Sequence, residues 1–107
     1  MDFAFATCDE ILPELGARLR AQRLVQSLTQ QQLADMANVS LGTVKTLERS
    51  GSSSLETLVR VVQALGLADD LAPLFELKLH SIAQMQTLSQ AKRQRASRPK
   101  NPWQAKS

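Results

Sequence analysis

Residues 29–49, TQQQLADMANVSLGTVKTLER, constrain the fold more than any other stretch of the chain. Thr29 is a good helix N-cap, and Gln32 at the third helical position can complete a capping box. Asn38 tolerates the left-handed conformation that a tight turn between helices requires. Ser40 can then cap the next helix. The stretch therefore predicts two short helices joined by a tight turn.

Apolar residues give each of these two helices one inward face. On the first helix this face consists of Leu33, Ala34 and Ala37, and on the second of Val44 and Leu47. The outward residues of the second helix are Leu41, Gly42, Thr43, Lys45 and Thr46. Gly42 costs about 1 kcal/mol of helix propensity relative to Ala. That cost is easier to explain if another molecule must approach the backbone closely.

The preceding segment predicts an amphipathic helix of roughly three turns. Leu15, Leu19 and Leu24 recur near helical spacing and are expected to face inward. The residues expected to point away from the core are Arg18, Arg20, Gln22 and Arg23. Two starting points are open: a capping box formed by Thr7 and Glu10, and a first turn at Leu12 or Pro13.

Two further helices are expected after the serine-rich loop 50–54. Ser54 can cap a fourth helix that ends before Gly66. Its expected inward residues are Leu55, Leu58, Val59, Val62 and Leu65. The fifth is expected to be capped by Asp69 or Asp70, with Pro73 in its first turn and with Leu71, Leu74 and Phe75 facing inward.

These segments predict an all-α fold: a compact five-helix domain with a C-terminal extension. Aromatic residues make up only 4% of the chain, so Leu, Val, Ile and Ala must fill the core. We divide the chain into an N-terminal arm (1–10), the helical domain (11–77), a candidate helical extension (78–91) and a basic tail (92–107), which is expected to be disordered in the free protein.

Charge is distributed unevenly along the chain. The net charge is +3, but residues 92–107 hold six basic and no acidic residues, which leaves −3 for residues 1–91. A basic tail is typical of contact with nucleic acid or an acidic partner surface, and a merely solvated end is the alternative. Residues 29–50 have no net charge, so attraction to phosphates would depend on Arg18, Arg20, Arg23, the paired sites of a dimer and the tail.

Composition argues against several other classes of protein. With one histidine (His80), one cysteine (Cys8) and no glycine-rich phosphate loop, the chain predicts neither an enzyme nor a metal or cofactor site. The start of the chain lacks a signal-peptide pattern, and no window approaches the ~18 apolar residues of a membrane span. We expect a cytoplasmic protein without membrane contact. A purely structural interaction module is the remaining alternative.

Residues 15–75 resemble the DNA-binding domain of Cro/C1-type (XRE family) transcriptional regulators. The similarity is carried by TQQQLA, VSLGTVKTLER and SLETLVRVVQALGL. It implies a lambda-repressor-like fold in which the second short helix enters the major groove of double-stranded DNA. By this resemblance Gln30 contacts a phosphate, and Leu41, Gly42 and Thr46 face base edges. Thr43, Lys45 and Arg49 lie near the DNA backbone or the groove wall, and Ser40 is a further DNA-binding residue.

The length, the Leu-rich fifth helix and the basic extension ending in NPWQAKS resemble HipB-type antitoxins, whose partners are HipA-type serine/threonine kinase toxins. The similarity implies a homodimer that represses its own operon at an inverted-repeat operator and binds such a toxin. Trp103, in the tail motif RQRASRPKNPWQ, is the expected partner-binding residue. A solitary Cro/C1-type repressor without a toxin partner is the alternative.

Overall fold

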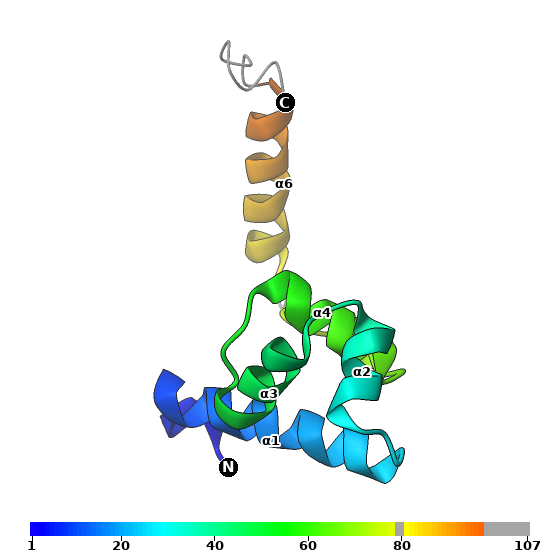
Figure 1. The fold of residues 1–107 in the computed structure, drawn as a ribbon. Helices are drawn as coiled ribbons and strands as arrows, with labels where there is room; N and C mark the ends of the chain where they lie inside the picture. The colour runs from blue at the N-terminus through cyan, green and yellow to red at the C-terminus, as the bar shows by residue number, and fades with distance from the viewer. Residues whose placement is uncertain (79–80, 98–107) are drawn as a thin grey trace. The chain divides into compact units, whose positions relative to one another are not determined.

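The computed structural model of the chain describes residues 1–78 and 81–97, and every regular element in these residues is helical (Figure 1). The chain divides into two units, residues 1–74 and the residues from 75 on. The first unit contains a 3₁₀ turn, η1 (Phe3–Phe5), and five α-helices. These are α1 (Cys8–Val25), α2 (Gln30–Ala37), α3 (Leu41–Ser50), α4 (Leu55–Ala64) and α5 (Ala68–Leu71). The all-α, five-helix prediction is confirmed.

Aliphatic side chains form the core of the first unit. Helix α1 packs on α3, α2 packs on both α3 and α4, and α5 packs on α4 (Figure 1). The buried apolar residues of unit 1–74 are Leu19, Leu33, Ala34, Ala37, Val44, Leu47, Val61, Val62 and Leu65. At Gly16 of α1 an added Cβ would collide with the carbonyl oxygen of Leu47. The core therefore depends on a close approach of α1 to α3.

Helix α1 begins at the earlier of its two expected starting points and is longer than the expected three turns. Thr7 is its N-cap: the Thr7 hydroxyl accepts from the Glu10 N–H at 3.2 Å, and the Glu10 carboxylate accepts from the Thr7 N–H at 2.9 Å. This reciprocal pair selects the first of the two expected starting points. Pro13 lies in the second turn, where it cannot donate to the carbonyl of Asp9, and α1 continues through it to Val25.

The inward faces of α4 and α5 differ from the prediction. Val61 is buried in α4, whereas Leu55 is 76% exposed. Helix α5 has only four residues, lacks a side-chain cap at Leu67 and ends before Pro73. Leu74 and Phe75 were wrongly expected to face inward, and Phe75 is 98% exposed. The short α5 presents too few turns to bury both of them.

The second unit contains α6 (Ile82–Ser97). Ile82 and Met85 are exposed, and α6 continues past residue 91 to Ser97. Residues 98–107, including Trp103, lie outside the described residues. Among the helices that the structure describes, none is long and apolar enough to cross a bilayer.

Candidate nucleic-acid interface

Local capping chemistry fixes the arrangement of α2 and α3. The Thr29 hydroxyl accepts from the Gln32 N–H at 3.0 Å, and the Gln32 side chain accepts from the Thr29 N–H at 2.8 Å. Asn38 ends α2 in the left-handed region with φ 58°. The Ser40 hydroxyl then caps α3 by accepting from the Thr43 N–H at 3.1 Å. The predicted caps and the left-handed turn are confirmed.

One ridge of α3 points away from the core. Val44 and Leu47 are buried against the other helices, as expected. Gly42, Thr46 and Arg49 recur at i, i+4 and i+7, which places them along one line on the opposite face. Lys45 is exposed beside this ridge, and Leu41 is half-buried at the start of the helix.

Gly42 leaves unused space on this ridge. A Cβ built there meets only the Ser40 hydroxyl oxygen, at 4.0 Å, among the neighbours that the structure describes. Packing within the chain therefore does not require glycine here. The missing side chain instead lets a ligand approach the backbone of α3 closely.

Hydroxyl groups line a groove between the start of α3 and the start of α4. We call it the hydroxyl groove, and its lining residues are Ser40, Gly42, Thr43, Thr46, Ser52, Ser53, Ser54 and Thr57. Residues 50–54 were expected only to form a loop, and Ser52, Ser53 and Thr57 were not among the expected DNA contacts. Serine and threonine hydroxyls can donate hydrogen bonds to phosphate oxygens. The run of consecutive serines could have indicated Ser52 and Ser53.

A buried ion pair holds the start of α2 in place. Arg23 of α1 donates to the Glu48 carboxylate of α3 through Nε at 2.7 Å and Nη2 at 3.0 Å, and Nη1 donates to the Leu28 carbonyl at 2.8 Å. The Gln30 amide donates to the same carboxylate at 3.1 Å. An amide nitrogen carries a second hydrogen, so Gln30 can be held by Glu48 and still donate to a phosphate.

This pair changes the electrostatics expected from the sequence. Arg23 was expected to point outward and attract phosphates, but it is only 6% exposed and neutralises Glu48. Because Glu48 is buried, the exposed charges of residues 29–50 are Asp35, Lys45 and Arg49, a net of +1 rather than zero. The surface of the two helices is therefore weakly attractive to an anion.

Arg18 is the second α1 arginine with a partner inside the chain. It donates to Glu14 at 2.8 Å, and its guanidinium carbon lies 4.9 Å from the centre of the Phe3 ring. Its side chain nevertheless remains 54% exposed. Arg18 can therefore still contribute to the surface potential, unlike Arg23.

The sequence of the chain matches the model of a known family. A model of the family described as "Helix-turn-helix domain" matches residues 14–75, more than half of the 107-residue chain. The chain belongs to this family. No curated protein matches its sequence significantly. The helix-turn-helix consists of α2, the Asn38 turn and α3, and the assignment makes the chain a DNA-binding transcriptional regulator of Cro/C1 type.

Proposed function

We propose that the protein is a sequence-specific repressor that inserts α3 into the major groove of double-stranded DNA. The observation that carries this proposal is the outward ridge of Gly42, Thr46 and Arg49, whose residues take no part in the buried core. An α-helix fits the major groove, and the preceding helix then crosses the phosphate backbone.

The side chains divide into two groups in this docking. Gly42, Thr46 and the half-buried Leu41 face the base edges, where Leu41 offers apolar contact to a thymine methyl group. The residues assigned to phosphates are Gln30, Ser40, Thr43, Lys45 and Arg49, together with the serines of the hydroxyl groove. Few direct base contacts are available, so DNA shape is expected to contribute to sequence selection.

The regulator is proposed to act as a homodimer on an inverted repeat, with half-sites about one helical turn apart. Footprinting of the DNA upstream of the protein's own reading frame tests this directly. Two protected segments on one face of the duplex are expected, with affinity well above that for random DNA. Equal affinity for random DNA and the upstream region would overturn the proposal.

Within this class we propose the antitoxin of a HipBA-like system that acts in the cytoplasm and binds a HipA-type kinase toxin. The support is the resemblance in the basic motif around Trp103, a large aromatic residue in a polar segment. Co-purification with the product of the adjacent reading frame, lost on Trp103→Ala, is expected. If deletion of residues 92–107 changes neither repression nor the set of co-purifying proteins, the solitary repressor is the correct alternative.

A further inference from the structure

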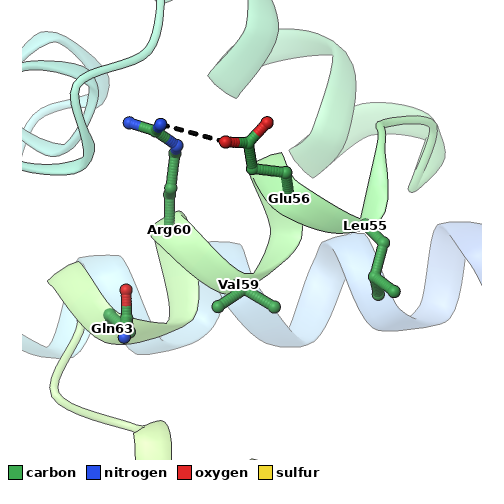
Figure 2. A pocket seen from close by; sticks show the side chains of 5 residues that line it. All are labelled: Leu55, Glu56, Val59, Arg60 and Gln63. Atoms are coloured by element: carbon green, nitrogen blue, oxygen red, sulfur yellow. Dashed lines mark hydrogen bonds and ion pairs between the residues drawn. The ribbon is translucent and has the colours of Figure 1, made fainter. Parts of the chain in front are cut away.

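Helix α4 has an outward face that the core does not use. The α4 groove is lined by Leu55, Glu56, Val59, Arg60 and Gln63, all from this one helix. Figure 2 shows Leu55 and Val59 pointing to one side of the helix, and Glu56 and Arg60 reaching toward each other on another. Leu55, in the first turn of α4, is 76% exposed on this face.

The charges of the α4 groove are arranged so that the face is complementary to itself. Glu56 and Arg60 lie one turn apart and are joined by a 3.0 Å ion pair, with their side chains 75% and 41% exposed. When two such helices pack antiparallel about a two-fold axis level with Leu58, Glu56 of each copy lies opposite Arg60 of the other. The same axis places Val59 opposite Val59 of the second copy, within about 3 Å along the helix at a rise of 1.5 Å per residue.

The α4 groove and the hydroxyl groove lie on different sides of α4, in an arrangement that would let both copies of a dimer present α3 to one DNA duplex. Consecutive helical residues are about 100° apart, so Thr57 lies roughly a quarter turn around α4 from the line between Glu56 and Arg60. Thr57 lines the hydroxyl groove together with Thr46 of α3. A two-fold axis beside α4 can therefore run parallel to the direction in which α3 faces DNA, so that both copies present α3 to the same duplex.

We propose that the α4 groove binds the α4 groove of a second copy of this chain, forming the homodimer contact. The inference rests on the proposed function, because a two-fold dimer is what an inverted repeat requires. Beyond the dimer itself, the inference names the surface and its residues. Two reciprocal ion pairs between Glu56 of one copy and Arg60 of the other flank a contact between the two Val59 side chains.

Charge reversal and mixing test the proposal. We expect sedimentation analysis to show a dimer for the unaltered chain. Glu56→Arg and Arg60→Glu should each raise the dimer dissociation constant about tenfold or more, because like charges then face each other twice. Mixing the two variants should restore a dimer, since one copy then carries Arg at both positions and the other carries Glu at both. Repair by mixing cannot come from pairing within one helix.

The Glu14–Arg18 pair of α1 offers a matched control, because it has the same residue types and spacing on another surface. Glu14→Arg should leave the dimer intact, and circular dichroism should confirm that each variant retains its helices. A dimer unaffected by both α4 variants, or folded variants that stay monomeric when mixed, would overturn the α4 assignment and leave DNA binding standing. A chain that shifts no DNA would overturn the proposed function whatever its oligomeric state.

Discussion

Removing the Glu48 carboxylate should strongly destabilise the domain. The side chains of Arg23 and Glu48 are only 7% and 3% exposed, and two hydrogen bonds of 2.7 and 3.0 Å join them. In Glu48→Ala the guanidinium stays buried with the Leu28 carbonyl as its remaining acceptor among the bonds described above. An ionised group held away from water without its counter-ion is one of the costliest defects a small domain can contain.

Breaking a buried ion pair by removing one partner typically costs 3–5 kcal/mol, roughly a third or more of the stability of an ordinary domain. For a domain of this size that corresponds to a fall in melting temperature of roughly 12 °C or more. The exposed Glu14–Arg18 pair provides the scale for comparison, because its side chains are 33% and 54% exposed. Glu14→Ala should cost less than about 1 kcal/mol.

Urea unfolding followed by circular dichroism measures the loss of unfolding free energy in Glu48→Ala and in Glu14→Ala. The double variant Arg23→Met/Glu48→Leu should be more stable than Glu48→Ala, because no charge is then left buried and unpaired. The double variant should still be less stable than the unaltered chain, because the Leu28 carbonyl loses the hydrogen bond donated by Arg23. The reasoning is refuted if Glu48→Ala costs no more than Glu14→Ala, or if the double variant is as unstable as the single one.

Other predictions concern the α3 surface and the start of α1. Gly42→Ala should raise the free energy of unfolding by up to about 1 kcal/mol in thermal unfolding, because the space beside Gly42 is open. The same change should weaken operator binding, and an unchanged affinity would contradict a close approach of DNA to the backbone of α3. Replacing Lys45 and Arg49 by Ala should weaken binding in fluorescence anisotropy and reduce the salt slope by about 2 per protomer, and an unchanged slope would remove both from the phosphate contacts. Hydrogen bonds from the Thr7 N–H and hydroxyl lower the pKa of Glu10, so the capping box should stabilise the fold above the ordinary carboxyl pKa and lose its effect as pH falls through the lowered value. Melting temperatures of Glu10→Gln should therefore depend less on acidic pH than those of the unaltered chain.

The local features of the fold could be predicted from sequence because their causes lie within a few residues. A cap such as Thr29 or Ser40 bonds to an N–H three residues away, and Asn38 supplies the left-handed turn through its own backbone preference. Gly66 ends α4 in the left-handed conformation for the same local reason. The helix-turn-helix was therefore predictable in position and in shape.

The features that depend on packing between helices could not be predicted in this way. Arg23 and Glu48 are 25 residues apart in sequence, and only the approach of α1 to α3 pairs them. Periodicity also leaves the rotation of α4 open, since Leu55 and Val61 both fit an amphipathic helix. Contact of α4 with α2 selects the face that contains Val61 and leaves Leu55 in the α4 groove.

If the protein binds DNA as proposed, the sparse charge of the α3 surface should make dimerisation important for affinity. In the proposed docking, one copy offers Lys45 and Arg49 to the phosphates, while the hydroxyl groove contributes hydrogen bonds without charge. Because each neutralised phosphate adds a roughly equal electrostatic contribution, one copy should bind DNA weakly and with a shallow salt dependence. In the proposed dimer, a second copy on the adjacent half-site would double these contacts and would bind in an effectively intramolecular step. Operator affinity should therefore fall further when the contact between copies is lost than when any single hydroxyl of the groove is removed.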